Sequence, residues 1–274
     1  EDTLSLHDAL PISAAGGMMQ TAAEEGRFIE VLPFAEGDHA YVNRCLRLPP
    51  APAASVGCHE LTDPAQLQDL IGDCYAAYPG YNRQAVVAMW LQIYVDNLIP
   101  PVFAASFVIG RAIPVEPAGT RALFAHGWSE GFVVAGEGGP AHGDGFARFG
   151  HLLQAHLAPL VAAVASFGRS SPRLLWSCVA ESFQTVASAA EHAPLAFPEA
   201  VACADQLLES SAFPDGRPNP LHGLTRFGRE EAGHRERMRR VCCLRHFLPD
   251  FDTCRGCPTP LRRRPSSPDR DARV

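Results

Sequence analysis

The chain has 274 residues, 47% of them hydrophobic, and a formal net charge of −7 at pH 7. This length allows one large or two small domains, and the composition is typical of soluble globular proteins. The acidic balance argues against a nucleic-acid partner. A membrane-spanning helix needs about 20 largely apolar residues, and the best candidate, 86–113, is interrupted by Asp96, Asn97 and two prolines. We therefore expect no transmembrane span.

The extreme N-terminus is interpreted as a non-native segment covering residues 1–13. The string at 3–12 corresponds to the translation of a common sequencing-adapter oligonucleotide. Such segments are left out of fold prediction, as a tag would be. The residues that follow, up to about position 60, are weakly patterned and rich in proline.

Local signals downstream predict a mainly helical protein. Asp63 and Asn82 are good N-cap residues, and each precedes a run with helical spacing of apolar side chains. The second helix is expected to end before Pro100, since proline breaks helices, with a short third helix at 102–109. Further helices are predicted at 146–167, 172–192, 198–211 and 230–240.

A small amount of sheet is predicted between these helices. Two apolar runs, 123–125 and 131–134, flank Gly127 and indicate a β-hairpin. The stretch 136–145 contains Gly136-x-Gly138, which matches the dinucleotide fingerprint in letters. That fingerprint must open a helix, and Pro140 makes this unfavourable, so a loop is expected. The predicted fold class is α+β and predominantly α-helical.

The strongest chemical signal is a cysteine motif near the C-terminus. Cys242, Cys243, Cys254 and Cys257 follow the pattern Cys-Cys-x10-Cys-x2-Cys. Four thiolates suit either a tetrahedral zinc ion or an iron–sulfur cluster. Adjacent side chains diverge, so they chelate one small ion awkwardly and a wider two-iron cluster more easily. The spacing, however, matches neither of the usual ferredoxin patterns. Spacing alone leaves zinc and iron–sulfur as equal alternatives.

Other residues near the motif have two interpretations each. Arg245 and His246, between the two cysteine pairs, either place hydrogen bonds and positive charge beside a cluster or form a solvated loop. A basic run precedes the motif, at Arg235, Arg237, Arg239 and Arg240. It could attract an anionic partner, but a solvated helix face is the favoured interpretation. Trp128 is a candidate ligand-binding aromatic. The remaining cysteines are expected to pack as small hydrophobic side chains, at Cys45, Cys58, Cys74, Cys178 and Cys203.

The motif and its neighbours resemble a known family. The residues concerned are the segment 239–245, then Leu248-Pro249, then Cys254-x-x-Cys257-Pro258. Together they resemble the C-terminal signature of the siderophore-iron reductases, the bacterial ferric hydroxamate reductase family. Weaker similarity lies upstream, and the resemblance covers about 30–260. The upstream matches are Leu98-Ile99-Pro100-Pro101, Pro172-Arg173-Leu174-Leu175-Trp176 and Asn219-Pro220-Leu221.

The resemblance implies a [2Fe-2S] cluster held by Cys242, Cys243, Cys254 and Cys257. It also implies an oxidoreductase that reduces a ferric siderophore, favouring the hydroxamate type, by one electron and releases Fe(II). A separate ferredoxin or reductase would supply the electron, because no nucleotide site is evident. We expect the protein in the cytoplasm, where it could contact an inner-membrane importer peripherally.

The expected organisation has a helical siderophore-reductase domain, a cluster-binding segment and a disordered tail, at 14–229, 230–260 and 261–274. No acid–base catalytic residue is implied. The alternative is a siderophore-binding module without turnover, in which the cysteines hold a structural zinc or a sensing cluster. The two differ in metal content and in whether iron is reduced.

Overall fold

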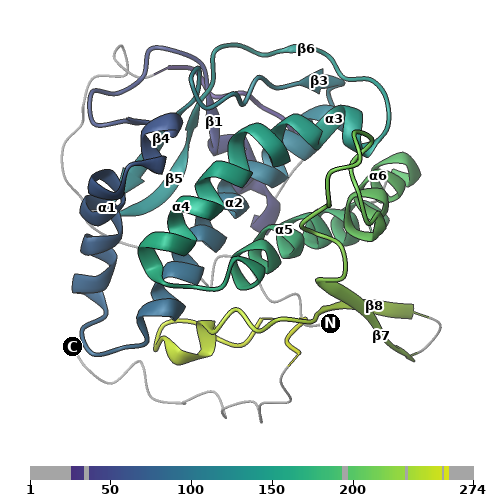
Figure 1. The fold of residues 1–274 in the computed structure, drawn as a ribbon. Helices are drawn as coiled ribbons and strands as arrows, with labels where there is room; N and C mark the ends of the chain where they lie inside the picture. Colours follow the sequence, from purple (N-terminus) through teal and green to yellow (C-terminus); the bar gives the residue numbers. More distant parts are fainter. Residues whose placement is uncertain (1–25, 34–36, 193–196, 232–233, 255, 259–274) are drawn as a thin grey trace.

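Helices dominate the structure, a computed structural model (Figure 1). The segments expected to be non-native (1–13) and disordered (261–274) lie outside the described residues. The structure describes residues 26–33, 37–192, 197–231, 234–254 and 256–258. The α-helices are α1 (Pro64–Ala77), α2 (Arg83–Phe107), α3 (Gly145–His151), α4 (Ala158–Gly168), α5 (Pro172–His192) and α6 (Pro198–Glu209).

The strands are short, and their order defines three small sheets. A four-stranded sheet has the order β1-β5-β4-β2, with β1 parallel to β5 and the other pairs antiparallel. Its strands are β1 (Leu46–Arg47), β2 (Val56–Gly57), β4 (Arg121–Ala125) and β5 (Trp128–Val133). The two-stranded sheets pair β3 (Arg111–Ala112) with β6 (Gly139–Pro140) and β7 (Thr225–Glu231) with β8 (His234–Arg239).

Helix α2 forms the centre of the core. The Asn82 side chain caps it by accepting a hydrogen bond from the Ala85 N–H at 3.1 Å, as the sequence predicts. The helix is apolar on all sides and packs between β5 and α5. By length and composition alone, α2 and the stretch Gly145–Gly168 are each long and apolar enough to cross a membrane. The fold buries 89% of the most apolar window of α2, which is typical of a core helix.

The prediction that α2 ends before Pro100 is wrong, because the helix continues through Pro100 and Pro101 to Phe107. A proline inside a helix leaves the carbonyl four residues earlier without its backbone donor. Here the Asp96 carbonyl accepts a hydrogen bond from the Tyr41 hydroxyl at 3.4 Å instead. Both prolines are buried, so packing offsets the remaining cost.

The predicted hairpin is confirmed, and its turn lies against α1. Strands β4 and β5 are antiparallel and joined by His126 and Gly127. Both turn residues have positive φ, 51° and 82°, the backbone that a two-residue hairpin loop needs. The Trp90 indole N–H donates to the Gly127 carbonyl at 2.9 Å, which fixes the turn against the core.

Replacing Gly127 with alanine is expected to lower the free energy of unfolding. The loss should exceed the cost of a strained backbone conformation alone, which is about 1 to 3 kcal/mol. A Cβ atom there would lie 2.2 Å from the Leu70 carbonyl oxygen, in addition to the strained positive φ. Gly216→Ala is the matched control, since Gly216 has φ 84° but open space around its Cβ position. Urea unfolding of both variants measures the difference. Equal losses of stability would show that the contact with Leu70 has no effect.

The long helical stretch after the glycine-rich loop is interrupted by a π-helical segment. The predicted helix at 146–167 is present as α3, a π-helical segment η4 (Leu152–Leu157) and α4. The π-segment places His156 in the interior, where its Nε2 lies 2.7 Å from the Tyr94 hydroxyl. The glycine-rich stretch itself forms a loop containing β6, and α3 begins only at Gly145, so the loop prediction is confirmed.

The predicted helix at 230–240 is wrong, because this stretch belongs to the β7–β8 hairpin. The hairpin packs against α5, and the chain then runs past the end of α2, where the short 3₁₀ turn η5 (Arg245–Phe247) contacts that helix (Figure 1). The motif cysteines follow this path, so the segment is supported by both α2 and α5.

Candidate functional site

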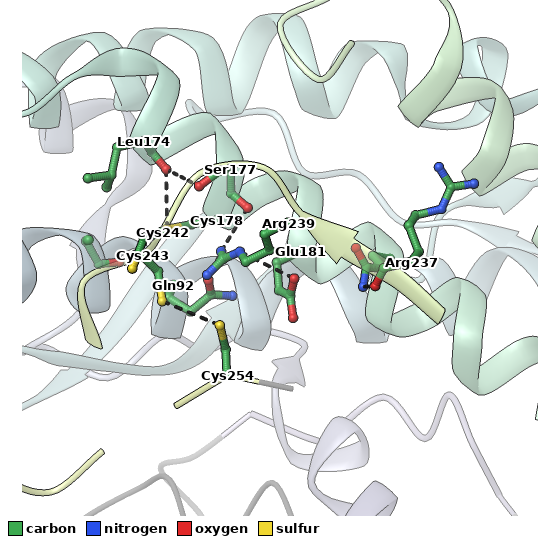
Figure 2. A network of polar contacts seen from close by, with 12 residues as sticks. Gln92, Leu174, Ser177, Cys178, Glu181, Arg237, Arg239, Cys242, Cys243 and Cys254 are labelled. Atoms are coloured by element: carbon green, nitrogen blue, oxygen red, sulfur yellow. Dashed lines mark hydrogen bonds and ion pairs between the residues drawn. The ribbon is translucent and has the colours of Figure 1, made fainter. Parts of the chain in front are cut away.

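The structure brings two of the four motif thiols together. Cys243 Sγ and Cys254 Sγ share a hydrogen bond at 4.0 Å (Figure 2). Four sulfurs at about 2.3 Å from a tetrahedral metal are separated by about 3.8 Å from one another. The observed spacing is therefore close to one edge of such a tetrahedron, and the donor set fits an iron–sulfur cluster.

The other two motif thiols, those of Cys242 and Cys257, are partly exposed. Cys242 Sγ accepts a hydrogen bond from the Leu244 N–H at 3.4 Å and lies 3.8 Å from His246 Nδ1. The Cys257 N–H donates to the Cys254 carbonyl at 3.1 Å, which closes the Cys-x2-Cys turn. Within the described residues, no three His, Cys, Asp or Glu side chains are close enough together to hold one metal ion.

The electrostatic surroundings favour an anionic sulfur at Cys243. Its hydrogen bond with Cys254 lowers the pKa of Cys243, and the positive charges of Arg239 and Arg245 lower it further. The same shared proton raises the pKa of Cys254. Metal ligands are thiolates, so a thiol that ionises readily suits this role. Arg245 and His246 thus lie beside the thiols, as the functional interpretation of these residues requires.

The interpretation of the basic run as a solvated helix face is wrong. Arg239 is only 1% exposed, and its guanidinium donates to Gln92 Oε1 and the Ser177 carbonyl, both at 2.8 Å (Figure 2). Arg237 forms ion pairs with Asp205 and with Glu209 of α6. The side chain of Arg235 lies outside the described part of the chain. Residues 237 and 239 therefore anchor the strand to the helices.

The cysteines outside the motif are buried, which confirms their interpretation as packing residues. Burial raises the pKa of Cys178, which lies in α5 near the site, to about 12. Its thiol is 3.6 Å from the Ala88 carbonyl and stays protonated. Trp128 is also buried, edge-on to Tyr78 at 6.3 Å between ring centroids, so packing accounts for it rather than ligand binding. The buried set is Cys45, Cys58, Cys74, Cys178 and Cys203.

Sequence reasoning missed Arg239 and its partners on α2 and α5. Gln92, Ser177 and Glu181 are far from the motif in sequence, and only the fold brings them to it. The one available signal was the position of Arg239, three residues before the first motif cysteine. Its burial depends on contacts that local patterning does not encode.

Comparisons with solved structures find similarity in fold. Aerobactin synthetase IucA from a hypervirulent pathotype of Klebsiella pneumoniae, in its ATP-bound form, matches 62% of this chain with 14% identity and a TM-score of 0.50. A second structure of that synthetase matches the same share with 13% identity and a TM-score of 0.52. The match spans 37% and 38% of the respective synthetase chains. No curated protein sequence matches the chain.

Two family models match in sequence. Residues 88–235 match the family described as "Ferric iron reductase FhuF-like transporter". Residues 239–258, which include all four motif cysteines, match the "FhuF 2Fe-2S C-terminal domain". The second match resolves the alternative between zinc and iron–sulfur in favour of a [2Fe-2S] cluster. The chain therefore belongs to the FhuF-like ferric iron reductase family and carries that family's C-terminal 2Fe-2S domain.

Proposed function

We propose that the protein reduces ferric siderophores, with Cys242, Cys243, Cys254 and Cys257 as the cluster ligands. The observation that carries this proposal is the match of 239–258 to a 2Fe-2S domain, together with the Cys243–Cys254 pair beside a buried arginine. When bound, the cluster supplies one electron to Fe(III) held in the siderophore. In the proposed organisation, 230–260 binds the cluster and 14–229 provides the helical support.

The substrate class follows from the chemistry of iron. Hydroxamate oxygens are hard ligands that suit Fe(III), and they hold the softer, less charged Fe(II) far less tightly. Reduction therefore releases the metal, which leaves as Fe(II). No protein acid or base needs to act for this release, and we propose that the cysteines serve only to hold and insulate the electron carrier.

The unequal exposure of the four cysteines supports docking of the redox partners at the solvent-exposed side of the segment. Cys243 is buried, whereas Cys242, Cys254 and Cys257 are partly exposed. Beside Cys242, the His246 ring lies tilted against the ring of Phe247, which is 48% exposed. We propose that the ferric siderophore and the electron donor, a ferredoxin or a separate reductase, dock at this exposed side. The cytoplasm, at or near an inner-membrane importer, is the proposed location.

Chemically reduced, cluster-loaded protein is expected to release Fe(II) from a ferric hydroxamate when a ferrous chelator is present. The amount trapped should equal the amount of reduced cluster, after removal of excess reductant. NADPH alone should give no reaction. The chelator matters because trapping Fe(II) pulls an unfavourable transfer forward.

The Cys178→Ser variant is the positive control, since Cys178 is buried in α5 and lies outside the motif. Siderophore without protein gives the background. Fe(II) formation no greater than this background, with a fully loaded cluster, would eliminate the reductase proposal and leave a siderophore-binding module without turnover.

A further inference from the structure

A charge pair with a buried arginine and a largely buried glutamate lies beside the motif cysteines. Arg239 Nε is 3.3 Å from Glu181 Oε2, and the two side chains are 1% and 15% exposed (Figure 2). The guanidinium also donates to Gln92 and to the Ser177 carbonyl. The backbone N–H of Arg239 donates to the Gly256 carbonyl at 2.9 Å, inside the Cys-x2-Cys turn. One residue thus links the cluster segment to α2 and α5.

Burial of such a pair is costly, and hydrophobic residues of similar size often give a more stable protein. Stability alone is therefore a weak reason for an arginine at this position. The pair lies within electrostatic reach of the motif thiols: Arg239 interacts with Cys243 and Cys254, and Glu181 interacts with Cys254 (Figure 2). Both charges therefore lie close enough to act on a cluster bound by these thiols.

We propose that the Arg239–Glu181 pair sets the reduction potential of the cluster, with Arg239 raising it and Glu181 lowering it. Reduction adds one electron, and hence one negative charge, beside these fixed charges. A cation stabilises the reduced form and an anion destabilises it, most strongly where water is excluded. Arg239 acts through this field and by positioning the Cys254–Cys257 turn, without contact with the siderophore.

The test is a potentiometric titration of cluster-loaded protein, followed by EPR of the reduced cluster. Glu181→Gln keeps the shape of the side chain and removes the opposing charge, so the reduction equilibrium constant should rise by about tenfold, or about 59 mV for one electron. Arg239→Lys keeps the positive charge and should shift the potential of the parent little. Arg239→Gln is made together with Glu181→Gln, so that neither charge of the pair is left without its partner. That double variant should have a lower potential than Glu181→Gln.

Arg237→Gln is the matched control. Arg237 lies on the same strand, away from the thiols (Figure 2), and is also paired with carboxylates, those of Asp205 and Glu209. Its substitution should leave the potential unchanged. Iron and sulfide counts must equal those of the parent in every variant compared. Should the double variant fail to load, Glu181→Gln still decides the question.

An unchanged or lower potential in fully loaded Glu181→Gln would overturn the proposal, as would an equal shift in Arg237→Gln. The inference rests on the cluster and not on the siderophore. The titration contains no siderophore, so a negative result leaves the reductase proposal standing. Conversely, the reduction potentials could shift as predicted while the protein transfers no electron to any ferric siderophore. That result would eliminate the reductase proposal and leave this inference standing.

Discussion

Replacing Cys254 with serine is expected to abolish a normal [2Fe-2S] spectrum. Cys254 faces Cys243 at 4.0 Å, and the pair forms the best-defined part of the donor set. A serine hydroxyl ionises far less readily than a thiol and is a poor replacement for a soft thiolate ligand. Cys243→Ser should have the same effect. Absorption and EPR spectra, with iron and sulfide counted per chain, measure the loss.

Cys178→Ser provides the control for this experiment. Cys178 is fully buried close to the site, yet burial keeps its pKa high, at about 12, and its thiol donates to the backbone carbonyls of Ala88 and Leu174. Its substitution should cost some packing stability and spare the cluster. A normal spectrum in Cys254→Ser, or a lost one in well-folded Cys178→Ser, would contradict the ligand assignment.

The buried His156 is expected to make folding stability depend on pH. Burial lowers the pKa of His156 to about 4, against an ordinary value of about 6.5. Its Nδ1–H donates to the Val115 carbonyl at 2.6 Å, so Nε2 accepts from the Tyr94 hydroxyl and the ring is neutral. Between these two pKa values the unfolded chain binds more protons than the folded one. Stability is therefore lost as the pH falls, by about 2 kcal/mol between pH 7.5 and pH 5.

Asp96 has the opposite effect on stability, because burial raises its pKa to about 6. As the pH falls towards this value, the folded state binds a proton that the unfolded state does not yet bind. The contribution of His156 is therefore measured as a difference, by urea unfolding of the parent and of His156→Gln at several pH values. The stability advantage of the parent should shrink by about 2 kcal/mol from pH 7.5 to pH 5. A pH-independent difference would show that His156 is not held neutral by burial.

The features that the sequence predicts well are those encoded by neighbouring residues. The caps at Asp63 and Asn82 act on backbone groups two and three residues away, and both are present. The turn at Gly127 requires a local positive φ, which favours glycine. The cysteine motif is equally local, and its match to the family's 2Fe-2S domain supports the cofactor expected from it.

The errors arise where distant contacts decide the outcome. Pro100 is tolerated inside α2 because Tyr41, far away in sequence, donates to the Asp96 carbonyl. The strand β8 forms in a charged segment because Arg239 finds its partners on α2 and α5. Neither contact leaves a periodic signal near the residue it affects. The central electrostatic feature of the site was consequently hidden from sequence reasoning.

Electron transfer from the cluster to siderophore-bound iron is tested most directly by mixing reduced, cluster-loaded protein with a ferric hydroxamate of the ferrioxamine type in a stopped-flow spectrometer. Cluster reoxidation is expected to be faster than in buffer, and its rate should increase with siderophore concentration. Arg237→Gln should behave like the parent. Reoxidation no faster than in buffer, across hydroxamate, catecholate and carboxylate siderophores, would contradict the claim that this cluster delivers its electron to siderophore-bound iron.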